Sequence, residues 1–184
     1  MDDKMIAVDA AGAGLVMRPS THESMQAVGV YRAECIGPDG QVKWVDEFPN
    51  VVVTVGKNDM LDQYLAGSSW STGTVYMGLK GTGTALAADT MVSHSSWSEL
   101  NISSSSGVRQ SVSFSSASAG AKATSAAVSW SITSTSTVFG CFIVVGGTST
   151  NGNTTGTLFS AGDFAASRAV VSGDTVNITY SVSV

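Results

Sequence analysis

Apolar and polar positions alternate over many short stretches of this chain, which is the pattern of half-buried β-strands. In the first clear case, VGVYRAECI, the residues Tyr31, Ala33 and Cys35 fall on one face of a strand. The GPDG stretch that follows supplies a proline and a glycine suited to a tight turn, and alternation resumes in QVKWVDEF. The pattern therefore predicts a β-hairpin. Pro49-Asn50 is predicted to break the pairing, and VVVTV to begin another strand.

Alternation is stronger in the second half, where Ser and Thr occupy most polar positions. Residues 138–145, VFGCFIVV, are apolar on both faces and predict a central strand. Two other stretches place apolar residues at every second position: Ala126, Val128, Trp130 and Ile132 in one, and Val176, Ile178, Tyr180 and Val182 in the other.

Residues 57–66 are the one stretch with helical spacing. Asn58 or Asp59 can cap the start of this helix, and Gly67 stands where a C-terminal glycine belongs. Its apolar stripe is predicted to pack into the core and consists of Met60, Leu61, Tyr64 and Leu65.

Eight or nine strands, one helix and no alternation of strands with helices predict an all-β protein, an antiparallel jelly-roll-like β-sandwich with one short helix. Residues 27–184 form the β-sandwich domain in this interpretation. Residues 1–26 show no period and are interpreted as an N-terminal arm. Leu15, Val16 and Met17 are the part of this arm that could dock into a groove of a partner.

Charged residues make up 12% of the 184 residues, about half the usual share, and the net charge is −5. The nine cationic residues are scattered singly, whereas binding to nucleic acid requires clustered Lys and Arg. Direct contact with nucleic acid is therefore not expected. The start of the chain, MDDKMIAVDA, is acidic where a signal peptide is basic, and no apolar run approaches the ~20 residues of a membrane span. We expect neither secretion nor membrane insertion.

The two cysteines, Cys35 and Cys141, both fall in strand-like segments. The simplest interpretation is a pair of reduced, buried thiols, as expected for a chain made in the cytoplasm. A disulfide between them stays open, because sequence does not show the geometry that the bond needs.

The stretch DTMVSHSSWSEL, residues 89–100, raises the question of catalysis because it combines Asp89, His94 and several serines. Ser93 and Ser95 flank His94, so in a strand they point to the opposite face, and no serine has a G-x-S-x-G context. We therefore predict a structural stretch and no enzyme. Asp89 forms a turn or cap in this interpretation.

No cofactor or metal is expected, because His22 and His94 are the only histidines and no zinc-binding spacing is present. Paired carboxylates for glycoside cleavage stay open from the sequence, since such residues can lie far apart along a chain. Trp70 lies in a polar loop and is the best candidate for an exposed aromatic contact, either with a protein or with a sugar.

The order of motifs resembles that of a family of small tailed-bacteriophage structural proteins encoded with head genes. The resemblance spans residues 40–184, with an Arg at 109 before a strand and Gly173-Asp174 before the last strand. Its most recognisable pieces are N-x-V-x-x-x-G-x-N, here Asn50, Val52, Gly56 and Asn58, and DTMxSHxxWxE, here Asp89, Thr90, Met91, Ser93, His94, Trp97 and Glu99.

Several proteins of this kind are capsid cement or decoration proteins with a jelly-roll body. The resemblance therefore implies a virion protein on the capsid exterior, made in the bacterial host cytoplasm, that clamps neighbouring major-capsid subunits and stabilises the DNA-filled head. The expected partners are the major capsid protein and other copies of this chain, as a dimer or else a trimer. The interface candidates are Leu15, Val16, Met17, Trp70, His94 and Trp97. The alternative is a tail or fibre component with a carbohydrate-binding adhesion head.

Overall fold

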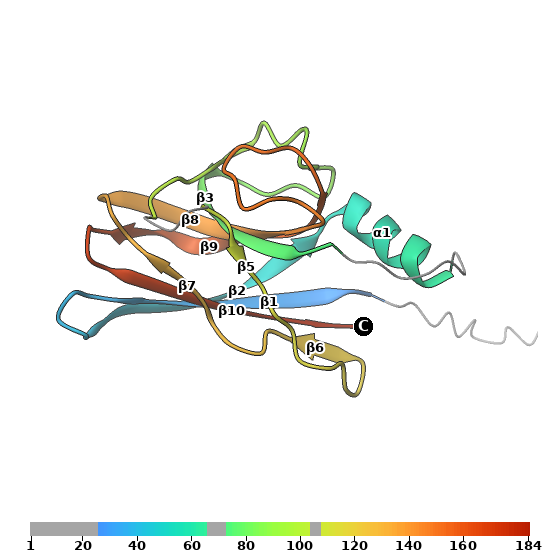
Figure 1. Ribbon diagram of the computed structural model, residues 1–184, viewed down its shortest axis with the longest axis horizontal. Helices are drawn as coiled ribbons and strands as arrows, with labels where there is room; N and C mark the ends of the chain where they lie inside the picture. The colour runs from blue at the N-terminus through green and yellow to red at the C-terminus, as the bar shows by residue number, and fades with distance from the viewer. Residues whose placement is uncertain (1–25, 66–72, 104–107) are drawn as a thin grey trace, which may run out of the picture.

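The computed structural model describes residues 26–65, 73–103 and 108–184, which form two stacked antiparallel sheets (Figure 1). The first sheet consists of β1 (Val28–Ile36), the first part of β2 (Val42–Val52), β10 (Thr175–Ser183), β6 (Ala121–Ala123) and β7 (Val128–Ser131). The second sheet consists of the end of β2, β9 (Thr157–Val170), β8 (Ser136–Val145), β3 (Val75–Gly83), β4 (Trp97–Glu99) and β5 (Gln110–Ser111). The predicted all-β, sandwich-like fold with one short helix is confirmed for the described residues.

Strand β2 belongs to both sheets and forms the corner between them. It pairs with β1 as far as Pro49 and then with β9 from Asn50, opposite Gly162. The predicted break at Pro49-Asn50 is wrong, because the strand continues there and changes its partner instead. A proline has no amide hydrogen to donate, which suits a point where one ladder ends and another begins.

The two faces that meet between the sheets form the main hydrophobic core. Tyr31, Cys35 and Trp130 are fully buried there, as the alternation predicted. The hydroxyl of Tyr31 lies 2.6 Å from that of Ser160, a hydrogen bond that joins β1 to β9. Cys35 and Cys141 are both buried, free thiols, which confirms the prediction of reduced cysteines. Burial, with the nearby Asp174 carboxylate, raises the pKa of Cys35 to about 12, so this thiol stays protonated at neutral pH.

A second, smaller core covers the opposite face of the second sheet. On β3, Met77 and Leu79 point into the main core, whereas Gly78 and Lys80 point to this second side. Loops that cross above β3, β8 and β9 in Figure 1 cover this side. The apolar side chains buried beneath them are Val53, Ala85, Met91, Trp97, Phe142, Val144, Leu158 and Ala161.

Helix α1 (Thr54–Leu65) begins three residues before the predicted start, directly after β2, so the predicted VVVTV strand is wrong beyond Val52. The amide of Thr54 donates to the carbonyl of Ala87 at 2.8 Å, which anchors the first turn. The prediction that the apolar stripe packs into the core is wrong for Leu61 and Leu65, which are 46% and 72% exposed, whereas Met60 is half-buried. The side chain of Tyr64 and residue Gly67 lie outside the described residues.

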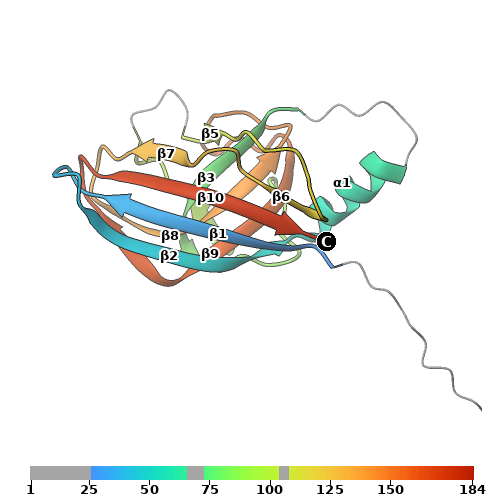
Figure 2. The same ribbon diagram turned by 90° about the horizontal axis from the view of Figure 1, so that it is seen from below.

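Figures 1 and 2 both show α1 extending beyond the two sheets from the end where β1 begins. Among the described residues, no helix is long and apolar enough to span a membrane. The predicted N-terminal arm, residues 1–26, lies outside the described part apart from its last residue.

Candidate functional site

The loop at residues 84–96, here called the lid loop, crosses the outer side of the second sheet and contains most of the DTMVSHSSWSEL stretch. The carboxylate of Asp89 is buried and accepts hydrogen bonds from the amide of Leu86 and the indole Nε1 of Trp97, both at 2.8 Å. Met91 and Trp97 insert into the second core. These contacts give Asp89 the role of fixing the lid loop on the sheet.

His94 is half-buried and stacks on Trp97, with ring centroids 4.2 Å apart. Its Nδ1 lies 3.0 Å from the carbonyl oxygen of Thr90, and the amide of Ser93 donates to the Thr90 hydroxyl. His94 therefore pairs with the backbone of its own turn rather than with a serine hydroxyl or the Asp89 carboxylate. A nucleophile, base and orienting acid are not assembled in this stretch.

An ion pair joins β3 to β9 beneath the start of the lid loop. Lys80 is fully buried, and its Nζ lies 2.6 Å from Oδ1 of Asp163, whose side chain is half-buried. Lys80 also donates to the carbonyl of Gly83, and Oδ2 of Asp163 accepts from the amide of Ala85 at 2.9 Å. The Lys80 ammonium lies 5.5 Å from the centre of the Trp97 ring, where a cation is attracted to the aromatic face.

A second ion pair, between Arg109 and Glu99, is buried on both sides and bidentate. The guanidinium Nε and Nη2 donate to the two oxygens of Glu99 at 2.8 and 3.0 Å. Arg109 also donates to the carbonyl of Asn153 at 2.7 Å, while Glu99 accepts from the amide of Gly152 at 2.8 Å. The pair therefore holds the loop at residues 146–156 against β4 and β5.

These two pairs and Asp89 form one arrangement, here called the anchor cluster: Lys80, Asp89, Glu99, Arg109 and Asp163. Each carboxylate of the cluster accepts a hydrogen bond from a backbone amide of a loop. Of the two cations, Arg109 donates to a loop carbonyl, and Lys80 donates to the carbonyl of Gly83 at the end of β3. A general base must present a free lone pair to its substrate, and these carboxylates use their oxygens to hold loops. The cluster stabilises a rigid surface instead. Its lid loop holds two apolar side chains in solvent, Leu86 at 51% and Val92 at 78% exposure.

Sequence reasoning missed the anchor cluster because its charges look like ordinary surface charges in the sequence. Lys80 follows the alternation of β3 and points to the outer face of the second sheet. That face is buried only because the lid loop covers it. The signal that was present is the scarcity of charge, since a lysine or arginine inside an apolar, charge-poor stretch is expected to have a buried partner. Within the described residues, no group of three or more His, Cys, Asp and Glu side chains is placed to hold a metal ion.

At the far end of the sandwich, Asp174 holds the turn between β9 and β10. Its buried carboxylate accepts from Lys43 Nζ at 2.6 Å, from the amide of Val171 at 2.9 Å and from the thiol of Cys35 at 3.5 Å. Burial alone raises the pKa of this carboxyl, but the three hydrogen bonds outweigh it and hold the pKa below its ordinary value. The hydrogen bond to Asp174 raises the pKa of Lys43.

These shifts predict an acid-sensitive contribution to stability. A carboxyl whose pKa is lower in the folded state stabilises the fold above its unfolded pKa, about 4, and loses that contribution as pH falls through the folded value. We expect Asp174→Asn to lower the melting temperature most at pH 5–7, and the difference from the wild type to shrink below about pH 4. Thermal melts between pH 2 and 7 measure this.

Lys43→Met is the second variant in that experiment. Removing the strongest hydrogen-bond donor brings the Asp174 pKa closer to its unfolded value, so the pH dependence becomes shallower while the carboxylate remains. If the difference in melting temperature between Asp174→Asn and the wild type is constant from pH 2 to 7, the lowered pKa of Asp174 does not contribute to stability.

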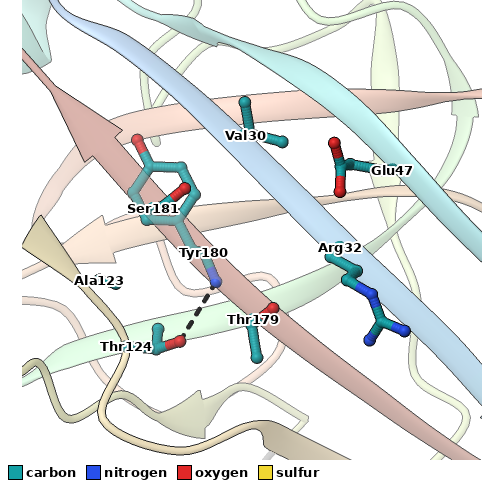
Figure 3. Close-up of a pocket in the computed structure, with 8 residues that line it drawn as sticks. All are labelled: Val30, Arg32, Glu47, Ala123, Thr124, Thr179, Tyr180 and Ser181. Carbon is teal, nitrogen blue, oxygen red and sulfur yellow. Dashed lines mark hydrogen bonds between the residues drawn. The ribbon is translucent and has the colours of Figure 1, made fainter.

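A hollow on the outer face of the first sheet measures about 360 Å³ (Figure 3). Arg32 and Glu47 occupy one side of it, opposite the hydroxyl groups of Thr124, Thr179 and Ser181. The ring of Tyr180 is buried, so the hollow offers no aromatic face for stacking. It is an open depression lined by polar and apolar groups and not an enclosed pocket.

Of the predicted interface residues, His94 of the lid loop stacks on Trp97 at the start of β4, and Trp97 is buried in the second core. The exposed large apolar side chains of the lid loop are Leu86 and Val92. Leu15, Val16, Met17 and Trp70 lie outside the described residues.

Comparison with known proteins does not assign the chain to a family. No protein-family model matches it, and no curated protein matches it.

Proposed function

We propose that this protein is a structural protein of a tailed-bacteriophage virion, a cement protein that binds on the capsid exterior across neighbouring major-capsid subunits. The observation that carries the proposal is the anchor cluster. Its buried charges hold two loops rigidly over the second sheet, and the lid loop presents Leu86 and Val92 to solvent. A rigid surface with exposed apolar side chains is suited to permanent binding to another protein.

The residues that carry the resemblance to phage head-associated proteins support the same proposal. Asp89, Met91, Trp97 and Glu99 are all buried or hydrogen-bonded parts of the lid loop and its anchor. The DTMxSHxxWxE motif is therefore a fold motif in this chain, and a protein that shares it is expected to present the same kind of rigid loop. No catalytic role is proposed, and the net charge of −5 argues against the packaged DNA as a direct partner.

The test is to mix the purified chain with expanded capsids that lack it, pellet the capsids and measure bound protein and the temperature at which the capsids break. We expect stoichiometric binding and a raised breakage temperature. Val92→Asp is expected to weaken binding at least about tenfold, because it places a charge where an apolar side chain contacts the shell. Val45→Asp, an equally small change on the opposite sheet, is the control and is expected to bind normally.

A chain that begins at Ala27 tests the N-terminal arm in the same assay. Weaker binding of this shortened chain assigns residues 1–26, with Leu15, Val16 and Met17, to the capsid contact. Absence of binding by the full chain overturns the cement proposal.

The alternative function, a tail or fibre component with a carbohydrate-binding head, has one observation in its favour. The hollow of Figure 3 gathers three hydroxyls, a guanidinium and a carboxylate, which are groups that hydrogen-bond to sugars. Glycan binding by the wild type that is lost in Arg32→Ala would support this function, together with absence of binding to capsids.

A further inference from the structure

Helix α1 leaves its two leucines, Leu61 and Leu65, exposed to solvent. Gly56 is buried against β9, where an added Cβ would lie 2.5 Å from the carbonyl oxygen of Phe159. On the following turns the half-buried positions include Asp59, Met60 and Gln63, two of which are polar. A surface helix ordinarily places its apolar stripe toward the core and its polar face toward water.

Helical geometry places the two exposed leucines on one side of the helix. Asp59 and Gln63 lie two residues before and after Leu61, which places both about 160° around the axis from it. Leu65 lies four residues after Leu61 and so about 40° from it, on the same stripe. The side of α1 that faces away from the sandwich therefore carries the leucines. Such an exposed apolar stripe indicates a partner.

The helix also gains little stability from its own chain. It has 12 residues, a length at which an isolated helix is marginal in water, and its contacts to the body lie mainly in the first turn, where Thr54 and Gly56 contact the backbone and Val55 packs against the second core. Figures 1 and 2 show the remaining turns extending away from the sheets. A partner that covers Leu61 and Leu65 would supply the packing that keeps these turns helical.

We propose that the partner is the α1 helix of a second copy of this chain, packed antiparallel about a twofold axis that passes near Leu61. In this arrangement the two Leu61 side chains meet, and Leu65 of each copy lies near Lys57 of the other. Lys57 lies one turn before Leu61 and shares its stripe. The proposal adds a self-association element to the cement function and does not depend on which shell protein the dimer binds.

Charge favours this arrangement over a parallel one. The last turn of α1 contains no basic residue, so the partial negative charge of its final carbonyls has no cation of its own. Antiparallel packing brings the Lys57 ammonium of one copy to the last turn of the other. Parallel packing, including packing about a threefold axis, brings the Lys57 side chains together and places like charges side by side. A dimer is therefore favoured over a trimer.

Sedimentation equilibrium of the full chain tests the proposal, with an expected mass of twice 18.8 kDa. The double variant Leu61→Asp/Leu65→Asp is expected to weaken dimerisation by roughly a hundredfold or more, because it buries unpaired carboxylates in an apolar contact and brings the two new charges at position 61 together at the axis. At a low concentration where both proteins are monomeric, the double variant and the wild type should have similar melting temperatures. Val92→Asp, at an exposed apolar site on the lid loop, is the control and should remain dimeric.

Disulfide formation by a cysteine at the proposed twofold axis is a second test, which does not depend on weakening the dimer. Leu61→Cys is expected to form a disulfide-linked dimer on mild oxidation, whereas Val92→Cys is not. Cys35 and Cys141 are buried and do not compete. A chain that is monomeric at all concentrations, a trimer, or a dimer that survives Leu61→Asp/Leu65→Asp overturns the proposal. Capsid binding by a monomer would overturn the dimer and leave the cement function in place.

Discussion

Replacing Arg109 with alanine is expected to destabilise the fold by about 3–5 kcal/mol, a large part of the stability of a domain of this size. Arg109 and Glu99 are both buried, and the guanidinium satisfies both carboxylate oxygens. Its removal leaves the Glu99 charge in the interior with the amide of Gly152 as its remaining hydrogen-bond donor among the described residues. Urea unfolding of the variant and the wild type, followed by tryptophan fluorescence, gives the difference in unfolding free energy.

The chain contains a matched control for this substitution. Arg32 also pairs with a glutamate, Glu34, but at 3.6 Å and on the outer face of the first sheet, where its side chain is 50% exposed. Arg32→Ala is expected to change stability by no more than about 1 kcal/mol, since water screens the pair and replaces it readily. If the two substitutions lower the free energy of unfolding equally, burial does not determine how much Arg109 contributes to stability.

A second variant separates two effects of Arg109→Ala, the unpaired charge of Glu99 and the lost packing of the arginine side chain. Adding Glu99→Gln to Arg109→Ala removes the buried charge while keeping the shape of the side chain, so the double variant should be more stable than Arg109→Ala alone. Hydrogen exchange should show faster opening at residues 146–156 in both, because the contacts of Arg109 to Asn153 and Thr148 are lost in each. A double variant less stable than Arg109→Ala contradicts this account.

The sequence was informative about the sandwich because alternation reports directly on a sheet with one buried face. Tyr31, Cys35 and Trp130 point into the core as the pattern predicted, and residues 138–145 form β8, which lies between β3 and β9. The GPDG turn forms with the amide of Gly37 donating to Gln41 at 2.8 Å. These features depend on neighbours along the chain, which is the information that a pattern contains.

The sequence was not informative where contacts between distant segments decide the outcome. The apolar stripe of α1 has the spacing of a core helix, but Gly56 is the residue that approaches β9, and this turns Leu61 outward. Similarly, Lys80 and Asp163 are 83 positions apart, and no local pattern reports that they meet under the lid loop. The candidate site was therefore predicted only in part. The DTMVSHSSWSEL stretch was predicted to be structural, but the charged side chains that hold the lid loop were not predicted.

Gly83→Ala is expected to destabilise the protein by about 3 kcal/mol or more, and to do so by lifting the lid loop. Gly83 has a φ of 102°, in the region that favours glycine, and an added Cβ would lie 1.7 Å from the carbonyl oxygen of Ser96. The positive φ costs roughly 1–2 kcal/mol for a residue with a side chain, and the forced displacement of the Ser96 backbone adds about 1–3 kcal/mol. Urea unfolding measures the total.

The displacement has a specific consequence because Gly83 is also where Lys80 donates its backbone hydrogen bond and where β3 pairs with Trp97 of β4. Displacing the backbone at Gly83 separates the Trp97 indole from the Asp89 carboxylate. It also separates the Lys80 ammonium from the Gly83 carbonyl oxygen. Hydrogen exchange should therefore accelerate in residues 84–99 while β1 and β10, in the other sheet, keep their protection.

Gly40→Ala is the control that separates backbone conformation from steric clash. Gly40 also has a positive φ, 77°, but an added Cβ would have no atom within 4 Å. It should lose only the conformational part, about 1 kcal/mol, and exchange in the lid loop should not change. If Gly83→Ala is no more harmful than Gly40→Ala, then the β3–β4 junction is loose enough to absorb a methyl group. The proposed binding surface depends on a rigid lid loop, so this result would remove the structural support for that surface.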